Sequence, residues 1–506
     1  MKRALISVYE KEKIEKIASA LNKAGWEIVS TGGTAAFLKG KGIPVSDVSA
    51  ITKFPEILDG RVKTLHPLIF GPVLAKKTAG HLDQLKELGA DKIDLVIINF
   101  YPFEAALASK ADDMDTMLAN IDIGGPSLVR AAAKNFKYTI VLIDEKDYGP
   151  VIAAIESNSE IPLELKKRLA QKAFAYTAFY DSLIAAFLAR GQADPPDFMT
   201  IGGRLEQALR YGENPHQSAF LAVSDCCSPF HAIEQLHGKE LSFNNILDAA
   251  MVYEVLNDFQ AEGHFAVIVK HQNPCGAAMT PAQPQAFKGA FAGDPRSAYG
   301  GIVGFNHFLE AETAAAMADV FFEVIIAPGF SDAALAILRK KKNLRLIRMA
   351  PGYKEKADFK TIPGGFVYQN RDNLSFAVDD FVRKTGRPLG KKDKANVEFG
   401  WKLIKYVKSN GIIIVKNLKL IGVGAGQASR IDAVELAIHK SQSSVAGAVL
   451  LSDAFFPFPD SVELAARHKI AVVVETGGSV HDADVIQSAR KLGIRLLFSG
   501  IRHFRH

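Results

Sequence analysis

The chain has 506 residues, of which 48% are hydrophobic and 23% are charged, so it should fold around large cores and is not disordered as a whole. At about 100–200 residues per domain, this length predicts two to four domains. The 61 Lys and Arg residues exceed the 55 Asp and Glu residues by six, which favours an enzyme of anionic metabolites over a nucleic-acid-binding protein.

The cysteine content and the apolar runs indicate where the protein works. Three cysteines, Cys226, Cys227 and Cys275, are too few for a disulfide framework, so a reducing compartment is expected. The N-terminal segment becomes charged before an apolar run of signal-peptide length can form. No apolar stretch approaches the roughly 18 residues needed to cross a bilayer. We therefore expect a cytoplasmic protein without a membrane segment.

Val- and Ile-rich runs alternate with helical patterns along the chain, which is typical of an α/β fold. Buried strands are predicted in the first third at residues 4–8, 26–30, 94–100 and 138–143. Between the first two, residues 14–21 place apolar side chains on one helical face, and Gly25 ends the helix. Residues 163–189 predict a long helix.

A domain boundary is predicted at residues 191–198 (GQADPPDF), because two adjacent prolines cannot continue the preceding helix. This divides the chain into residues 1–195 and 196–506. The second region is too long for one typical domain, so we expect two packed subdomains. Both halves contain a strand that leads into an unusual turn, at residues 265–270 and 420–423, which suggests a divergent internal duplication.

Several segments of the first domain carry groups suited to a phosphorylated ligand. They are residues 31–34 (TGGT), 60–67 (GRVKTLHP), 99–103 (NFYPF) and 122–126 (DIGGP), followed by Arg130 and Lys134 on one helical face. Each segment taken alone also fits an ordinary turn or a charged surface loop. Together they predict a pocket with cations for phosphate and with Lys, Tyr and Asp side chains for proton transfer.

The second region ends a wholly apolar strand with residues 270–276 (KHQNPCG). A Lys beside a His is costly to bury without a role, which favours a functional pair over a core histidine. A zinc site is not supported, since no PCxxC follows and Cys226 and Cys227 are adjacent. Residues 422–427 (GVGAGQ) have GxGxG spacing, which excludes the dinucleotide fingerprint but leaves Arg430 nearby as a partner for another anion.

These blocks recur in order as a set: STGGT, GRVKTLHP, NFYPF, IDIGGPSLVRAAAKN, RYGENPHQ, KHQNPCG, SAYGG, GVGAGQASR, SDAFFPFPD and GIRHFRH. With them, essentially the whole chain closely resembles the bifunctional purine-biosynthesis family that joins phosphoribosylaminoimidazolecarboxamide (AICAR) formyltransferase to IMP cyclohydrolase. One block differs from the pattern frequent in that family, because residues 475–479 read ETGGS where QPGGS is common.

The resemblance implies an N-terminal methylglyoxal-synthase-like doubly wound domain and a C-terminal region of two cytidine-deaminase-like α/β subdomains without catalytic zinc. The C-terminal region would transfer a formyl group from 10-formyltetrahydrofolate to the 5-amino group of AICAR, giving formyl-AICAR and tetrahydrofolate. The N-terminal domain would then close formyl-AICAR to IMP with loss of water. Members of the family are homodimers with transferase sites at the subunit interface, and they need no catalytic metal.

The resemblance also implies roles for individual residues. The residues that match the catalytic positions of the cyclohydrolase are Lys63, Tyr101, Asp122 and Lys134, and those of the transferase are Lys270 and His271. The residues that match nucleotide-binding positions of the first site are Ser7, Lys11, Thr31, Gly32, Gly33, Thr34, Arg61 and Thr64. Those that match AICAR recognition are Arg210, Tyr211, Asn245, Glu323, Asn410 and Arg502, and those near folate are Ser297, Ala298, Tyr299 and Gly300.

Two other functions fit the sequence less well. A nucleotide-sensing module with the fold of the first domain would not need Lys63, Tyr101, Asp122 and Lys134 together, since a sensor moves no proton. An RNA-binding protein could use the basic stretch at residues 339–348, but the modest net charge and the lack of an RRM, KH or OB motif argue against it.

Overall fold

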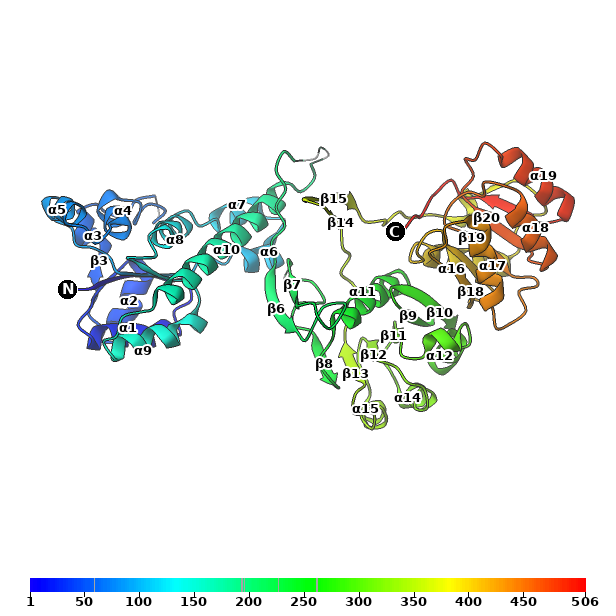
Figure 1. Cartoon of the computed structure of the whole chain (residues 1–506), viewed down its shortest axis with the longest axis horizontal. Helices are drawn as coiled ribbons and strands as arrows, with labels where there is room; N and C mark the ends of the chain where they lie inside the picture. The colour runs from blue at the N-terminus through cyan, green and yellow to red at the C-terminus, as the bar shows by residue number, and fades with distance from the viewer. Residues whose placement is uncertain (59, 193, 195, 226, 261–262) are drawn as a thin grey trace. The chain divides into compact units, whose positions relative to one another are not determined.

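The computed structural model describes residues 1–58, 60–192, 194, 196–225, 227–260 and 263–506. Two positions of the predicted linker, Ala193 and Pro195, and one of the adjacent cysteines, Cys226, lie outside the described residues. The chain forms two compact units (Figure 1): Met1–Arg204 with a short segment from Ser224 in the first, and Leu205–Val223 with Cys227–His506 in the second.

The first unit is built on a five-stranded parallel sheet in the order β3-β2-β1-β4-β5. Its strands are β1 (Arg3–Ser7), β2 (Glu27–Ser30), β3 (Ser46–Asp47), β4 (Leu95–Ile98) and β5 (Ile140–Leu142). The strand order reverses between β1 and β4, and in doubly wound sheets ligands bind beyond the carboxyl ends of the strands at this point. The fold therefore places a ligand crevice between the ends of β1 and β4.

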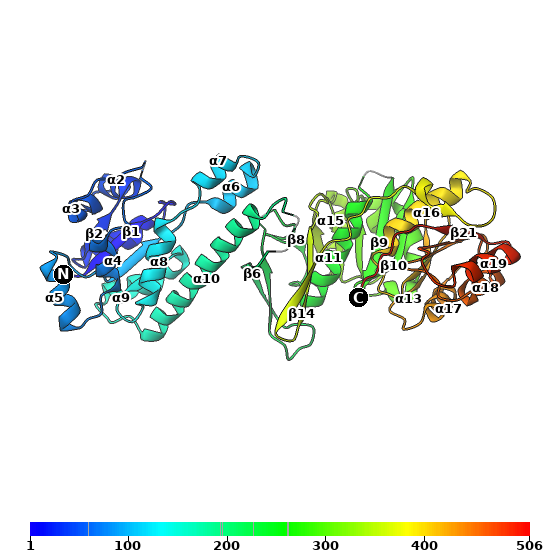
Figure 2. The ribbon, with the colours of Figure 1, turned by 90° about the horizontal axis from the view of Figure 1, so that it is seen from above.

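Helices cover both faces of this sheet (Figure 2), and each face has its own hydrophobic core. The helices are α1 (Ile14–Lys23), α2 (Gly32–Gly40), α3 (Val48–Thr52), α4 (Pro67–Leu74), α5 (Ala79–Glu87), α6 (Phe103–Lys110), α7 (Met114–Ala119), α8 (Gly124–Lys134), α9 (Tyr148–Glu156) and α10 (Leu163–Leu188), with a 3-10 turn η1 (Glu145–Asp147). The predicted doubly wound domain is confirmed, and both ends of each predicted strand and of the long helix lie within two residues of the observed ends.

The second unit contains two six-stranded sheets. The first has the order β10-β9-β11-β12-β13-β8, with β8 (Glu234–His237), β9 (His264–Lys270), β10 (Asn273–Thr280), β11 (Ile302–Phe305), β12 (Val324–Ala327) and β13 (Arg345–Arg348). The second has the order β18-β17-β19-β20-β21-β16, with β16 (Val382–Arg383), β17 (Ile412–Val415), β18 (Leu420–Gly424), β19 (Val449–Ser452), β20 (Val472–Glu475) and β21 (Arg495–Phe498).

Both sheets have one topology. In each, a β-hairpin forms one edge, the next strand runs antiparallel to it, two parallel pairings follow, and an antiparallel strand closes the other edge. The two predicted α/β subdomains are confirmed, and their matching topology agrees with an internal duplication. A single core joins them, because α11 and α16 contribute Val252 and Trp401 to the same cluster of buried residues.

The helices of the first repeat are α11 (Phe243–Asp258), α12 (Gln283–Phe291), α13 (Pro295–Ala298), α14 (Ala311–Ala316) and α15 (Asp332–Leu338), and those of the second are α16 (Lys391–Ile404), α17 (Arg430–Lys440), α18 (Asp460–Arg467) and α19 (Asp482–Leu492). Two separate hairpins flank the first repeat, β6 (Arg204–Leu209) with β7 (Ala219–Val223) and β14 (Ala357–Ile362) with β15 (Gly365–Asn370), and a 3-10 turn η2 (Val378–Asp380) precedes the second.

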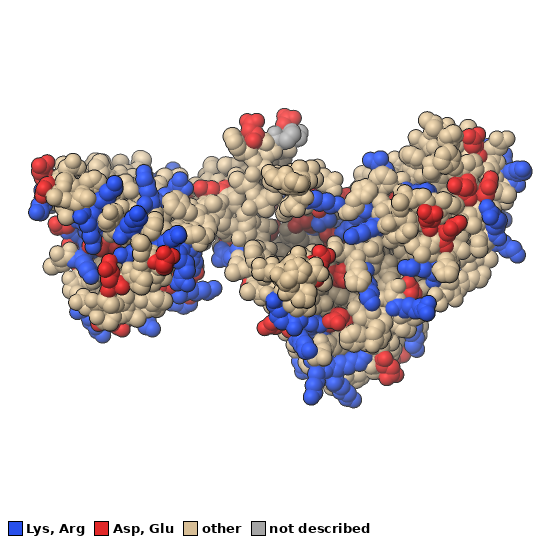
Figure 3. Space-filling view, in the orientation of Figure 1, with Lys and Arg blue, Asp and Glu red and all other residues tan. Residues whose placement is uncertain are grey.

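The surface does not present the basic stretch at residues 339–348 as a continuous stripe. Arg345 is 5% exposed and forms an ion pair with Glu323 at 2.5 Å, and Arg348 lies 3.3 Å from Glu234. Lys and Arg side chains are interspersed with Asp and Glu on the face shown in Figure 3. Within the described part of the chain, no helix combines the length and apolar character required to span a membrane.

Candidate functional site

The crevice of the first unit begins where β1 and β2 end. The Ser7 hydroxyl, at the end of β1, lies 3.4 Å from that of Thr31, which precedes the first residue of α2. Thr34, in the first turn of α2, accepts a hydrogen bond from the amide of Val8 at 3.1 Å and donates to its carbonyl at 2.9 Å. The start of α2 is thereby held at the sheet edge, and the N–H groups of its first turn, which have no acceptor within the helix, suit an anion.

Lys11 extends across the two glycines that begin α2. A Cβ atom at Gly33 would lie 3.4 Å from Lys11 Cε, so the small residue permits this close approach. The ammonium group donates to the carbonyl of Tyr9 at 3.0 Å, and the Tyr9 ring lies 6.0 Å from that of Tyr101 in an edge-to-face arrangement. Lys11, Gly33 and Tyr101 therefore border one crevice.

Asp122 forms the other side of this crevice, just before α8. Its carboxylate accepts the amide of Gly125 at 2.8 Å, and its own amide donates to the Tyr180 hydroxyl at 2.8 Å. Burial raises the pKa of Asp122, while backbone hydrogen bonds from Gly125 and Tyr101 and the charge of Lys63 oppose the shift. The backbone of Tyr101 therefore meets the Asp122 carboxylate, and the charge of Lys63 acts on it.

Thr64 adjoins the same helix start, because its hydroxyl would lie 3.2 Å from a Cβ on Gly124. Arg61 is exposed, and its backbone amide donates to Leu58. Glu56 was not singled out from the sequence, yet its carboxylate lies 3.8 Å from where a Cβ on Gly32 would be and 3.6 Å from one on Gly60. No motif around Glu56 signals this placement, which depends on the loop folding back over the glycine turn.

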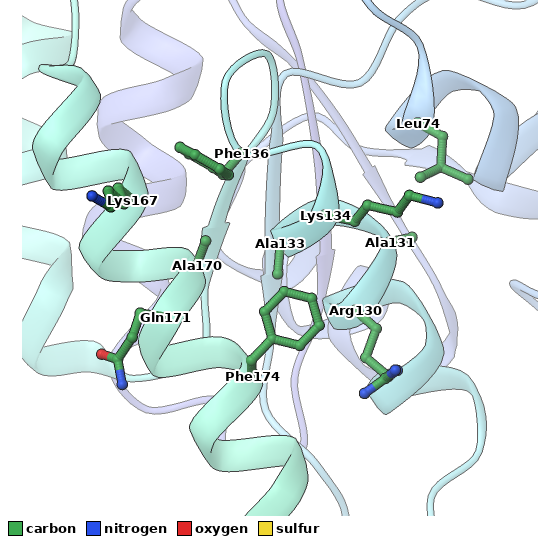
Figure 4. Close-up of a pocket in the computed structure, with 10 residues that line it drawn as sticks. All are labelled: Leu74, Arg130, Ala131, Ala133, Lys134, Phe136, Lys167, Ala170, Gln171 and Phe174. Atoms are coloured by element: carbon green, nitrogen blue, oxygen red, sulfur yellow. The ribbon is translucent and has the colours of Figure 1, made fainter.

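Lys134 lies away from this group. It is in the last turn of α8, about 15 Å along the helix axis from Gly124 at a rise of 1.5 Å per residue. There it lines a separate cavity of about 590 Å³ together with Arg130, whose guanidinium lies 5.6 Å from the centre of the Phe174 ring (Figure 4). Within one chain, the structure brings Lys63, Tyr101 and Asp122 together but not Lys134.

The second candidate site is centred on the hairpin turn between β9 and β10. His271 and Gln272 form this turn with positive φ angles of 52° and 55°. The carboxylate of Asp248, on α11, accepts both of their backbone N–H groups, at 3.0 Å and 2.6 Å. Lys270 ends β9, and its ammonium group donates to the carbonyl of Tyr299 at 2.6 Å. The predicted catalytic pair is therefore presented on a rigid turn.

The predicted folate segment and Glu323 adjoin Lys270. Gly300 has a φ of 72°, donates to the carbonyl of Phe321 at 2.8 Å, and would place a Cβ 3.9 Å from Lys270 Nζ. Tyr299 is 61% exposed and packs its ring 5.2 Å from that of Phe321. Glu323 donates its amide to Gly301 at 3.0 Å and pairs with Arg345. The last two residues of this segment therefore flank the catalytic pair.

Asn245 lies one helical turn before Asp248 and forms a capping box with Ser242. The adjacent Asn244 donates to the carbonyl of Glu213 at 3.3 Å, which ties the segment containing Arg210 and Tyr211 to the start of α11. The guanidinium of Arg210 lies over the Tyr211 ring, 5.5 Å from its centre.

The second repeat reaches the hairpin turn through Asn273, whose side chain accepts the amide of Lys408 at 3.1 Å. Asn410, two residues after Lys408, accepts a hydrogen bond from Arg430 at 2.8 Å. Between them, the amide of Ser409 donates to the carbonyl of Arg505 at 2.8 Å. The C-terminal segment that carries Arg502 is thereby held next to the loop of Asn410.

Arg430 is not available to an external anion. It is 7% exposed and forms an ion pair with Asp453, which is 0% exposed. The suggestion that Arg430 serves a ligand is therefore wrong: its charge is used to hold the buried carboxylate and Asn410.

Cys275 is half-buried. Burial raises the pKa of its thiol to about 12, so the thiol is neutral near pH 7. Among the described residues, no group of three or more His, Cys, Asp or Glu side chains is arranged to hold a metal ion.

Glu475, at the end of β20, is 0% exposed. One carboxylate oxygen accepts the amide of Phe456 at 2.8 Å, and the other has no hydrogen-bond partner among the described residues. Burial raises the pKa of Glu475 to about 7. The folded protein thus retains this proton across a pH range where the unfolded chain, with a pKa near 4.5, has lost it.

We expect Glu475→Gln to stabilise the protein increasingly as pH rises. From about pH 4.5 to 7 the folded parent binds more protons than the unfolded chain, so its free energy of unfolding falls as pH rises. Above pH 7 both states have lost this proton, and the free energy of unfolding falls no further on its account. The neutral amide removes this dependence, and at about 1.4 kcal/mol per pKa unit the advantage at pH 8 is about 3 kcal/mol. Unfolding of both proteins at pH 5 and pH 8 measures it; an advantage that is equal at both values would contradict the prediction.

Comparisons with known proteins identify families and relatives that this chain resembles. Residues 13–127 match the model of the MGS-like domain, and residues 132–440 match the model of the AICARFT/IMPCHase bienzyme. The chain is 44% identical over 515 residues to the bifunctional purine biosynthesis protein PurH of Thermoanaerobacter sp. (strain X514), covering 100% of both chains. It is 43% identical over 520 residues to the protein of that name from Persephonella marina, again covering 100% of both. A solved structure titled "Crystal structure of ForH" is 32% identical, with a TM-score of 0.35, and covers 38% of this chain and 100% of that chain.

Proposed function

Because this chain belongs to the AICARFT/IMPCHase bienzyme family, we propose how its residues divide the two reactions. The protein is a bifunctional enzyme of purine biosynthesis with AICAR formyltransferase and IMP cyclohydrolase activities, the last two steps of IMP synthesis. We assign the cyclohydrolase to residues 1–195 and the formyltransferase to residues 196–506.

In the cyclohydrolase, the carboxamide nitrogen of formyl-AICAR attacks the formyl carbon, an oxyanion forms, and water leaves. Lys63 and the Tyr101 hydroxyl stabilise the oxyanion or deliver a proton, and Asp122 orients the amide. The backbone hydrogen bonds and the Lys63 charge around Asp122 support this assignment. The start of α2, with Lys11, serves as the phosphate-binding end of the crevice.

By the same matching, Lys134 belongs to the proposed catalytic group, although within one chain it lies at the far end of α8 from Asp122. The remaining nucleotide contacts of this site are assigned to Ser7, Lys11, Thr31, Gly32, Gly33, Thr34, Arg61 and Thr64.

In the transferase, the AICAR amine is a weak nucleophile because its lone pair is delocalised into the ring and the carboxamide. His271 removes a proton from this amine as it attacks the formyl group, since imidazole titrates near neutral pH. Lys270 stabilises the oxyanion or protonates the leaving nitrogen of the folate. The observation that carries this proposal is the turn itself, which holds His271 next to Lys270 at a strand end.

The formyl donor is proposed to be 10-formyltetrahydrofolate, bound along residues 297–300. AICAR recognition is assigned to Arg210, Tyr211, Asn245, Glu323, Asn410 and Arg502, with the two arginines as phosphate partners. The exposed Tyr299 and Phe321 rings beside Lys270 support the folate assignment, because they offer a surface on which a pterin or benzoyl ring can pack.

We also propose that the protein is a cytoplasmic homodimer with its transferase sites at the subunit interface. The hairpin of β14 and β15 supports this, because it carries apolar side chains that are about half exposed, among them Phe359 at 48% and Val367 at 54%. A two-stranded hairpin is marginally stable in water, so a partner surface that covers these side chains would stabilise it. Sedimentation equilibrium tests the assembly: a monomer at micromolar concentration would contradict it.

The experiment that tests the proposed function is an assay of IMP formation from AICAR and 10-formyltetrahydrofolate, with formyl-AICAR followed as an intermediate. The folded protein should convert AICAR to formyl-AICAR and then to IMP, and should cyclise formyl-AICAR supplied on its own. Absence of both conversions by folded protein would overturn the proposal.

A further inference from the structure

The two repeats of the second unit each carry a hairpin with the same unusual turn. In the first, His271 and Gln272 have φ angles of 52° and 55°, and in the second, Asn417 and Leu418 have 56° and 55°. Left-handed backbone is unfavourable for residues other than glycine, and Asn tolerates it best. Both turns therefore need support from outside the hairpin.

The lysine that precedes each turn is held in the same way. Lys270 donates to the carbonyl of Tyr299 at 2.6 Å, three residues before β11, and Lys416 donates to that of Ala446 at 2.8 Å, three residues before β19. The next residue in each case is a glycine with positive φ, 72° for Gly300 and 75° for Gly447. The second repeat thus retains the lysine and its carbonyl acceptor but has Asn417 in place of His271.

The support beneath the turns differs in one atom. Asp248 and Asn396 are each the sixth residue of the helix that packs under the hairpin, α11 or α16. Asp248 accepts both turn N–H groups, from His271 at 3.0 Å and Gln272 at 2.6 Å. Asn396 accepts one, from Leu418 at 2.8 Å, and its amide offers one acceptor oxygen where the carboxylate offers two.

The charge of Asp248 is suited to this task. A carboxylate makes stronger hydrogen bonds to N–H groups than a neutral amide does. Burial raises the pKa of Asp248, whereas the two turn N–H groups and the charges of His271 and Lys270 oppose the shift. The residues that the carboxylate holds therefore also favour its ionised form.

We propose that Asp248 is the positioning residue of formyl transfer: by accepting both N–H groups of the turn, it holds His271 where its imidazole meets the AICAR amine. Only the repeat that carries the histidine has a carboxylate, Asp248, at the sixth residue of this helix, whereas the other repeat has the amide of Asn396 there. This inference rests on the proposed roles of Lys270 and His271.

The test compares Asp248→Asn with the parent protein. The variant reproduces the amide of the second repeat, so one turn N–H loses its acceptor and faces an NH₂ group instead. Since misplacement of a catalytic group by about 1 Å costs roughly 10²-fold in rate, we expect kcat for formyl transfer to fall about 10- to 100-fold. The KM for AICAR should change less than about threefold, and cyclisation of supplied formyl-AICAR by the same preparation should be unchanged.

A second variant separates positioning from other roles of the carboxylate. In the Asp248→Asn background, Gln272→Gly places glycine at a position that needs positive φ, so the turn can form with less outside support. We expect this double variant to regain at least several-fold in kcat. The matched control is Asn396→Asp, which introduces the carboxylate in the other repeat and should leave formyl transfer within twofold of the parent.

The outcomes are decisive. A kcat for Asp248→Asn within twofold of the parent, or a double variant no more active than Asp248→Asn, would overturn the positioning role. Failure of the proposed function is a separate result, because the parent protein would then show no formyl transfer at all and His271→Ala would match it.

Discussion

His271→Ala is expected to lower formyl transfer from 10-formyltetrahydrofolate to AICAR by about 10²- to 10⁴-fold, the range for loss of a general base. The turn is held through backbone N–H groups, so removing the imidazole leaves the support from Asp248 in place. Cyclisation of supplied formyl-AICAR should be unchanged, since it is assigned to the other unit. Both rates are measured on one preparation.

A matched control is Asn417→Ala, which truncates the equivalent turn residue of the second repeat. It should retain formyl transfer at the parent rate. If His271→Ala abolished both reactions in a folded protein, the division of the two activities between the units would be wrong; if it abolished neither, another residue would be the base.

Lys63→Met should have the reciprocal effect and lower cyclisation of formyl-AICAR by about 10²- to 10³-fold, as expected when a group that stabilises an oxyanion is removed. Lys63 contributes a positive charge beside the partly buried Asp122. Methionine keeps an unbranched apolar stem up to the Cε position and lacks the terminal nitrogen, so the loss reports the ammonium group. Formyl transfer should continue, and it is measured by the accumulation of formyl-AICAR.

The control for this substitution is Lys86→Met, at an exposed position in the last turn of α5. It removes one charge from the same unit and should leave cyclisation unchanged. A Lys63→Met enzyme that cyclises formyl-AICAR at the parent rate would remove Lys63 from the catalytic group.

Local patterns were enough to predict most of the architecture. The periodicity of residues 14–21 and the glycine after them predicted α1, which ends at Lys23. Apolar runs predicted β1, β2, β4 and β5, because strands buried on both faces need continuous apolar sequence. The motif that ends β9 also indicated a special turn, although it did not indicate that Asn273 begins the return strand β10.

The arrangement of the candidate sites could be predicted from the sequence only in part. The types and order of the motifs pointed to both reactions, but a motif does not state which of its residues meet. Lys134 shares a motif with Asp122, but Asp122 precedes α8 and Lys134 ends it, about 15 Å from Gly124 by helical rise. Arg430 follows a glycine-rich loop suited to an anion, yet its guanidinium pairs with the buried carboxylate of Asp453, 23 residues further along the chain.

The sequence by itself determined the α/β class and, through its ordered motifs, the family. These properties follow from spacing and residue type over short stretches, where hydrophobic periodicity and turn preferences act. Only the tertiary structure decided that Asp248 supports His271 from 23 residues away and that Asn273 meets Lys408 across 135 residues. Such contacts depend on how sheets and helices pack, and no local pattern encodes the pairing.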